Sequence, residues 1–250
     1  MKPNKKKNIA YNILGIISIT TAWQLGAYYT GNTDIFPSPV KSLVTLSRIA
    51  ATEDFWIHIG STLFRGILGG VLSLILGFVL GFLSSLNAPL RGIIMPWVIL
   101  LRSIPVISVI LLAIIWLAPG YVPFFIMMIT VTPIIVEEVS EGIIEINGRY
   151  KEMITIYKVS LQKQLKQVIL PGLLPRIASG FSLGMGYGWR AVVVGEVLSR
   201  PQWGVGDRMA HAQNYFNADE LIAWTVVLII ISYFFDKLID KIKNRLIKWQ

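Results

Sequence analysis

Apolar residues in this chain gather into six long segments that are separated by polar stretches. A helix needs about 20 apolar residues to cross a hydrocarbon core of about 30 Å, and most of the six segments approach that length. The fourth segment is the shortest, and it crosses the core only if its helix continues into the polar stretch 137–141. We therefore predict an all-α membrane protein with six transmembrane helices. The six segments are 9–29, 63–86, 93–117, 122–136, 177–198 and 221–238.

The positions of Lys and Arg assign the connections to the two sides of the membrane, because these residues accumulate in short cytoplasmic segments. They cluster before the first apolar segment, in the connection 141–176 and after the last segment. This distribution predicts that both termini are cytoplasmic. It also predicts a cytosolic connection at 141–176 that forms one or two short helices. Two long outer loops then remain, at 30–62 and 199–220.

This order divides the chain into three parts. Residues 1–58 hold a cytoplasmic tail, the first transmembrane helix and an outer loop. Residues 59–240 form the membrane core, which includes a cytoplasmic loop at 144–175. Residues 241–250 form a basic cytoplasmic tail.

Composition agrees with a protein that is built for lipid, since 54% of the residues are hydrophobic and 15% are charged. A net charge of +9 would suggest nucleic-acid binding in a soluble protein, but here the positive residues lie between the spans. We therefore expect the lipid bilayer, and no nucleic acid, as a partner. The chain has no cysteine, which excludes disulfides and cysteine metal sites.

Residues that could carry catalysis or bind a metal are sparse. The two histidines, His58 and His211, are far apart in the predicted outer loops, so we expect ordinary loop residues and no metal site. No Gly-rich phosphate-binding loop, nucleophile motif or carboxylate pair occurs in the sequence. We expect no catalytic residues and no cofactor in this chain, and any ATP must be bound by another chain.

The cytosolic connection carries a spaced pattern of residues. Glu152, Met153 and Ile154 are followed after three residues by Lys158, after nine more by Val168, and then by Leu170 and Pro171. This spacing resembles the EAA loop of bacterial ABC importer permeases, in which Glu-Ala-Ala is followed at the same intervals by Gly, an apolar residue and Leu-Pro. The chain departs from the pattern at the Gly position, where Lys158 stands. Gly permits a positive φ and a tight turn there, whereas Lys adopts that conformation at a cost.

Further stretches resemble permeases of the nitrate, sulfonate and taurine type, and the likeness extends over about 59–239. They are 101–117, 171–175 and 188–197, with Gly204 and Gly206 following. The resemblance implies a type I ABC importer permease (MetI-like) in a bacterial cytoplasmic membrane. It implies a second permease copy, two cytosolic ATPase subunits that hold ATP and Mg, and an external solute-binding protein. The solute would be a small anion or polar organic molecule, sulfonate-like, nitrate-like or pyrimidine-like.

The resemblance makes 155–167 our candidate coupling helix, which would lie in a groove of an ATPase subunit. Glu152 would stabilise the start of that helix, because a carboxylate interacts favourably with a helix N-terminus. The alternative is that the connection is only a basic cytosolic segment.

Three arginines lie within the apolar segments. Arg102 and Arg190 should face the bundle interior, since lipid exposure costs roughly 2.5–3.5 kcal/mol for each charge. They either shape a positive passage for an anion or form structural pairs. Glu196, a further candidate for the translocation path, would be a counter-charge in such pairs, as would the carboxylates at 137, 138 and 141. Arg65 lies near the outer end of its span, where we expect its side chain to snorkel to the interface.

Small residues and prolines mark packing and bending. Gly180, Gly184 and Gly188 are four apart, so one helix face can approach another backbone closely. We expect packing within one subunit there, with a pore or dimer role as the alternative. Pro105 and Pro133 each interrupt a span and predict kinks.

Two other classes of protein fit part of this pattern. A secondary transporter or channel would also have six spans and buried arginines, but it does not account for the spacing from Glu152 to Pro171. A membrane enzyme would require a nucleophile, a metal cluster or a carboxylate pair within the bilayer.

Overall fold

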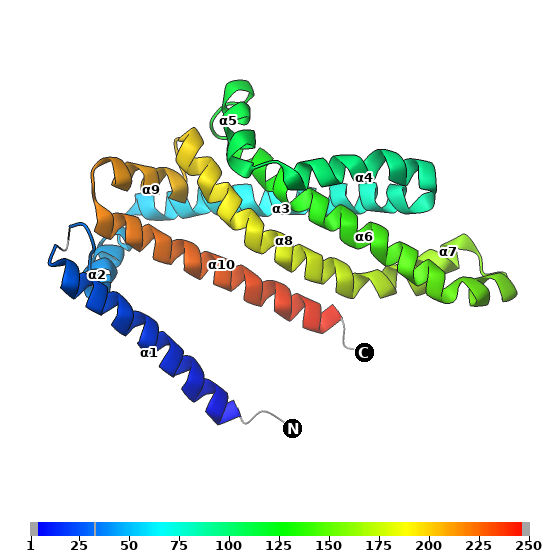
Figure 1. Cartoon of the computed structure of the whole chain (residues 1–250), viewed down its shortest axis with the longest axis horizontal. Helices are drawn as coiled ribbons and strands as arrows, with labels where there is room; N and C mark the ends of the chain where they lie inside the picture. The colour runs from blue at the N-terminus through cyan, green and yellow to red at the C-terminus, as the bar shows by residue number, and fades with distance from the viewer. Residues whose placement is uncertain (1–4, 33, 247–250) are drawn as a thin grey trace.

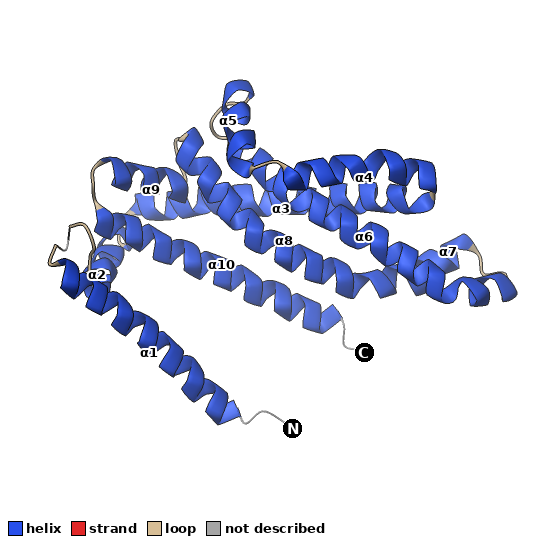
Figure 2. Cartoon of the chain, in the orientation of Figure 1, coloured by secondary structure: helices blue, strands red, loops and turns tan. Residues whose placement is uncertain are grey.

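The computed structural model describes residues 5–32 and 34–246, which form helices joined by short turns, with no strand among them (Figures 1 and 2). The helices are α1 (Lys5–Thr30), α2 (Pro39–Ala50), α3 (Glu53–Leu86), α4 (Ala88–Ser103), α5 (Val106–Trp116), α6 (Val122–Ile156), α7 (Leu161–Lys163), the π-helix η1 (Gln164–Ile169), α8 (Leu170–Ser199), α9 (Val205–Asn214) and α10 (Ala218–Leu246).

The core forms where α3, α6 and α8 pack side by side. Met127, Val131, Ile135 and Val139 recur every fourth residue of α6, and all four are fully buried. The neighbouring helices meet this stripe with glycines. A Cβ added at Gly81 of α3 would lie 2.7 Å from Val139 and 2.8 Å from the carbonyl oxygen of Val136. The missing side chains therefore allow the helix backbones to approach closely.

The fourth apolar segment was predicted to cross the membrane only if its helix continued beyond residue 136, and it does continue. α6 is unbroken through the polar stretch 137–141 and ends only at Ile156. Pro133 lies inside this continuous helix, so the chain is not interrupted there. The predicted span is confirmed as part of a much longer helix.

The third apolar segment, which we expected to be a single kinked helix, is broken in two. α4 ends at Ser103, α5 begins at Val106, and the two axes are bent by 99°. Pro105 cannot donate a backbone hydrogen bond, and it disfavours helical backbone at Ile104, which has ψ 131°. Together these effects end the helix rather than bend it.

Within the described residues, four single helical segments have the length and hydropathy of a membrane span, and the bent α4–α5 pair makes a fifth if it counts as one span. The structure thus supports four or five of the six predicted spans. α1 is not among them. It leaves the bundle at an angle (Figure 1). Most of its apolar side chains from Ile13 to Tyr29 are exposed, whereas Trp23 is half-buried and Ala27 is buried.

The prediction of two long outer loops was wrong, because most of both stretches is helical. The first holds α2 and the beginning of α3, and the second holds α9. Side-chain caps begin α2 and α3. Ser38 accepts a hydrogen bond from the Lys41 N–H at 3.2 Å, and Thr52 accepts one from the Phe55 N–H at 3.4 Å. The divisions drawn at 58/59 and 240/241 consequently fall inside α3 and α10.

α1 and α10 each have one end beside α2 and α9, and from there the start of α1 and the end of α10 extend in the direction of the turn between α6 and α7 but stop well short of it (Figure 1). α2 and α9 lie at the end of the bundle opposite that turn (Figure 1). The turn between α6 and α7 and the helix α9 therefore lie at opposite ends of the molecule.

Candidate functional site

The connection between α6 and α7 is a tight turn of four residues, Tyr157–Ser160. The rest of the loop predicted at 144–175, in which we expected one or two short helices, is helical. Lys158 has a φ of +47°, in the left-handed region. The Tyr157 N–H donates to the Met153 carbonyl at 3.0 Å and the Val159 N–H donates to the Ile154 carbonyl at 3.2 Å. A left-handed residue with such wrapped bonds is a frequent way to end a helix, and it usually employs Gly.

Replacing Lys158 with Gly is expected to stabilise the protein by about 1 kcal/mol, because a left-handed backbone costs an L-residue roughly 1–2 kcal/mol. Denaturant unfolding of the purified protein in detergent measures the change. Lys163→Gly is the matched control: Lys163 has a helical φ of −69°, so Gly should destabilise there. A loss of stability in both variants would contradict the argument.

The turn interrupts the predicted coupling helix 155–167, so that prediction was wrong as a single helix. Glu152, Met153 and Ile154 lie in the last turns of α6. We expected Glu152 at the N-terminus of a helix, and it lies instead near the C-terminus of one. Val168 belongs to η1, while Leu170 and Pro171 open α8. The return to the membrane is thus one helical path from Leu161 onwards. It widens into a π turn directly before Pro171, which has no N–H to continue the ladder.

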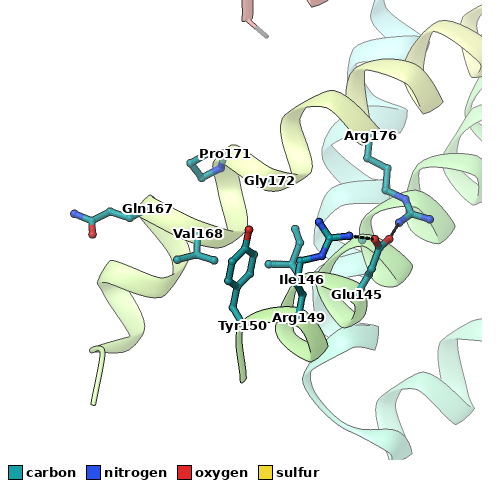
Figure 3. Close-up of a pocket in the computed structure, with 10 residues that line it drawn as sticks. Glu145, Ile146, Arg149, Tyr150, Gln167, Val168, Pro171, Gly172 and Arg176 are labelled. Atoms are coloured by element: carbon teal, nitrogen blue, oxygen red, sulfur yellow. Dashed lines mark hydrogen bonds and ion pairs between the residues drawn. The ribbon is translucent and has the colours of Figure 1, made fainter. Parts of the chain in front are cut away.

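A groove of about 360 Å³ separates the end of α6 from η1 and α8 (Figure 3). Ile146 and Tyr150 rise from α6 toward Val168, Pro171 and Gly172 on the other side. A Cβ at Gly172 would lie 2.9 Å from the Ile146 side chain, so this Pro-Gly pair lets α8 begin close against α6.

Arg176 closes the inner end of the groove by binding three carboxylates of α6. Its guanidinium lies 3.0 Å from Glu138, 3.5 Å from Glu141 and 2.6 Å from Glu145. These three acids recur at helical spacing and form one charged edge. Glu138 and Glu141 are therefore not counter-charges of Arg102 or Arg190, which was one of the alternatives.

Arg102 and Glu137 form an ion pair beside the break between α4 and α5. Both line a cavity of about 390 Å³ that also includes Ile104 at the break. Non-helical backbone at membrane depth is tolerated where it is buried or lines a cavity, which accounts for the break at this place. The structure thus gives Arg102 the structural partner that was one of the two alternatives.

Arg190 is exposed and lines a second cavity, of about 500 Å³, between α8 and α10. Asp236 and Asp240 of α10 line the same cavity. Within the described part of the chain, Arg190 takes part in no ion pair. The two cavities share Leu183 and Tyr187 of α8, so they adjoin one another.

Glu196 is fully buried and pairs with Arg65, not with Arg102 or Arg190. The Arg65 guanidinium lies 2.7 Å from the carboxylate and also donates to the backbone carbonyls of Trp203 (2.6 Å) and Gly120 (3.2 Å). Arg65 is thus mostly buried, and the prediction that it snorkels was wrong. Its hydrogen bonds join the beginning of α3, the end of α8 and two turns.

Other groups around Glu196 complete this buried cluster. Its carboxylate also accepts hydrogen bonds from the Thr62 hydroxyl at 2.9 Å and the Gly206 N–H at 2.9 Å. His58 is buried in α3 and accepts from the Gly204 N–H at 2.9 Å. His58 is therefore not an ordinary loop residue, and His211 lies in α9. Among the described residues, no group of His, Cys, Asp and Glu could hold a metal ion.

Gly180, Gly184 and Gly188 all face α6 of the same chain. An added Cβ would contact Glu138 at the first position, Val131 at the second and Met127 at the third. All three glycines are buried. This face of α8 is therefore occupied by packing within the subunit.

Comparison with known proteins agrees with this architecture. The model of the family described as "Binding-protein-dependent transport system inner membrane component" matches residues 73–248. The chain is 25% identical to the taurine transport system permease protein TauC of Escherichia coli (strain K12), over 93% of this chain and 86% of that protein. It is 31% identical to the bicarbonate transport system permease protein CmpB of Synechococcus elongatus (strain ATCC 33912 / PCC 7942 / FACHB-805), over 37% of this chain and 34% of that protein.

Solved structures share the fold at low sequence identity. A chain of the MetNI methionine ABC transporter in an inward-facing conformation aligns with a TM-score of 0.67 and 18% identity, covering 76% of this chain and 96% of that one. An amino acid ABC transporter crystallised with histidines gives a TM-score of 0.65 and 13% identity, covering 82% and 97%.

The family model covers well over half of the chain, and solved ABC transporter structures share its helical fold. This protein therefore belongs to the binding-protein-dependent transport system inner membrane components, as a multi-pass inner-membrane permease subunit of an ABC importer that works with a binding protein and with separate subunits that hydrolyse ATP.

Proposed function

We propose that this permease pairs with a second copy and docks two cytosolic ATPase subunits, which bind ATP and Mg, through the turn between α6 and α7. The complex moves a small anionic or polar organic solute, sulfonate-like in its chemistry, which an external binding protein delivers. The residues of the docking region are Glu152, Met153, Ile154, Lys158, Val168, Leu170 and Pro171, together with the turn residues between them.

The observation that carries the docking proposal is the projecting end of α6. This helix has 35 residues. It is therefore about 52 Å long, well beyond a hydrocarbon core of about 30 Å. Ile156 is 74% exposed at its end and Tyr157 is 76% exposed in the turn that follows. Large apolar side chains that project into water are typical of a surface that a partner covers.

The cytoplasmic side of this turn follows from charge. Lys158, Lys163, Lys166 and Arg149 surround it, and positive residues accumulate on the cytoplasmic side. The start of α1 and the end of α10 both extend away from α2 and α9 in the direction of this turn (Figure 1), which supports cytoplasmic termini. We propose α1 as the sixth span, because its exposed apolar side chains have no cover in this subunit and suit contact with lipid.

The class of solute rests on relatives and on one arginine. TauC and CmpB are named for taurine and bicarbonate transport. Arg190 lines an open cavity, and no ion pair among the described residues neutralises it, so it is available to a solute anion. Arg102 forms an ion pair with Glu137, so it is weaker support for an anionic solute than Arg190 is.

Tyr157→Asp tests the docking surface. In a reconstituted complex, loaded binding protein should stimulate ATP hydrolysis about tenfold less than in the wild type, because burying a new carboxylate against the ATPase subunit costs more than a kcal/mol. Tyr121→Asp is the matched control: Tyr121 adjoins the other end of the same helix and is 66% exposed. Equal stimulation in the two variants would refute docking at the turn.

Uptake of labelled ethanesulfonate, taurine and bicarbonate by the reconstituted complex tests the class of solute. ATP-dependent uptake of at least one of them is expected, and Arg190→Gln should reduce it. If the permease purifies without a nucleotide-hydrolysing partner and transports these solutes without ATP, the secondary-transporter alternative is favoured.

A further inference from the structure

The cavity between α8 and α10 carries charges of both signs. Arg190 projects into it from α8, and Asp236 and Asp240 project from α10. Ser182 and Tyr187 of α8 add hydroxyl groups to its lining. With a volume of about 500 Å³, the cavity has room for a small organic solute and several water molecules.

The three charges share this cavity without closing on one another. None of them forms an ion pair within the part of the chain that the structure describes. Asp236 and Asp240 are four residues apart on one helix face, where like charges repel each other. The cavity therefore has the carboxylates of Asp236 and Asp240 close to each other on α10, and the guanidinium of Arg190 separate from them on α8.

The adjoining cavity shows the contrast. There Arg102 and Glu137 form an ion pair, so each satisfies the other and neither is left for a ligand. In the cavity between α8 and α10 the equivalent space between cation and carboxylates is open. Lipid tails are a poor occupant of this space, because charges are costly beside hydrocarbon and stable beside water, protein or a polar ligand.

We propose that this cavity is a subsite for a small zwitterion, whose anionic group binds Arg190 and whose ammonium group binds Asp236 and Asp240. The guanidinium offers paired donors to a sulfonate or carboxylate, and an ammonium group relieves the repulsion between the two aspartates. This assignment rests on the proposed function and narrows its solute class, since a simple anion would leave the two carboxylates unpaired.

Binding to the purified permease–ATPase complex in nanodiscs tests the subsite without the binding protein. The probes are taurine, ethanesulfonate and ethylammonium, measured by saturation-transfer NMR. Taurine is expected to bind about tenfold more tightly than either of the others, which is what one additional charge-assisted contact contributes. Asp236→Asn combined with Asp240→Asn should reduce taurine to the affinity of ethanesulfonate, and Arg190→Gln should reduce it to that of ethylammonium.

Lys237→Gln is the matched control on α10. Lys237 lies between the two aspartates in sequence, but its ammonium group lies 5.5 Å from the centre of the Tyr233 ring and does not line the cavity. This variant should keep the preference for taurine. Equal binding of taurine and ethanesulfonate by the wild type overturns the zwitterion subsite and leaves an anion permease standing. Absence of binding by all three probes overturns the subsite as well, and the uptake measurement then decides the proposed function separately.

Discussion

Arg65→Gln is expected to lower the free energy of unfolding by about 3–5 kcal/mol, because it leaves the buried carboxylate of Glu196 without its cation. Glu196 has no exposed surface, and the Arg65 side chain is only 14% exposed, so water cannot replace the lost charge. The substitution also removes donors from the carbonyls of Trp203 and Gly120. Denaturant unfolding of the purified subunit in detergent measures the loss.

Arg149→Gln is the matched control for this result. Arg149 also pairs with a glutamate, at 3.0 Å from Glu145, but the two side chains are 67% and 57% exposed. An exposed ion pair of this kind contributes about 0–1 kcal/mol to the free energy of unfolding. Combining Arg65→Gln with Glu196→Gln should recover part of the stability, since the buried charge is then gone. Equal losses for Arg65→Gln and Arg149→Gln would show that the buried cluster does not hold this end of the bundle.

Gly81→Ala is expected to destabilise the protein by about 1–3 kcal/mol, because a single methyl group overpacks the contact between α3 and α6. The added Cβ would lie 2.7 Å from the Cβ of Val139 and 2.8 Å from the carbonyl oxygen of Val136. The Val136 oxygen is a backbone atom of α6, and the Val139 Cβ is bonded directly to that backbone. Rotation of a side chain therefore cannot remove the clash. The two helices must move apart, and unfolding in denaturant measures the cost.

Gly60→Ala separates the effect of packing from that of helix propensity. Gly60 lies in the same helix, and nothing lies within 4 Å of the Cβ that would be added. Ala should stabilise this position by up to about 1 kcal/mol, because it is the better helix former. The two substitutions are therefore expected to have opposite signs. A stabilising effect of Gly81→Ala would mean that α3 and α6 are not packed as closely as described.

The long helices were predictable because lipid leaves the backbone little choice. A segment such as 63–86 must satisfy its own N–H and C=O groups in the bilayer, so its apolar length predicts a helix directly. The helices α2 and α9 were missed because they have no long apolar stretch that would predict them. α2 and α9 are short and amphipathic. The only local signal at the start of α2 is Ser38 before Pro39, and α9 begins after Gly204 without a side-chain cap.

The turn between α6 and α7 was predictable only in part. The resemblance marked Lys158 as a position where the family pattern has a Gly that permits a tight turn, and the structure has a left-handed residue there, but the predicted coupling helix 155–167 ran through it. The spacing did not indicate that α6 runs to Ile156 or that η1 joins α8 without a loop. Helix ends depend on a few hydrogen bonds, such as that from Val159 N–H to the Ile154 carbonyl, which residue types specify weakly.

The sequence by itself determined that the chain lies in a membrane, that its long elements are helices and that Arg102 and Arg190 should avoid lipid. Only the tertiary structure decided which groups the arginines meet. Arg65 meets Glu196 across 131 positions, Arg102 meets Glu137, and Arg190 remains open to a cavity beside Asp236 and Asp240. The physical reason is register. Burial makes a counter-charge necessary, but its identity depends on how far each helix slides and rotates against its neighbours, and the small residues at their contacts set that only once the helices are packed.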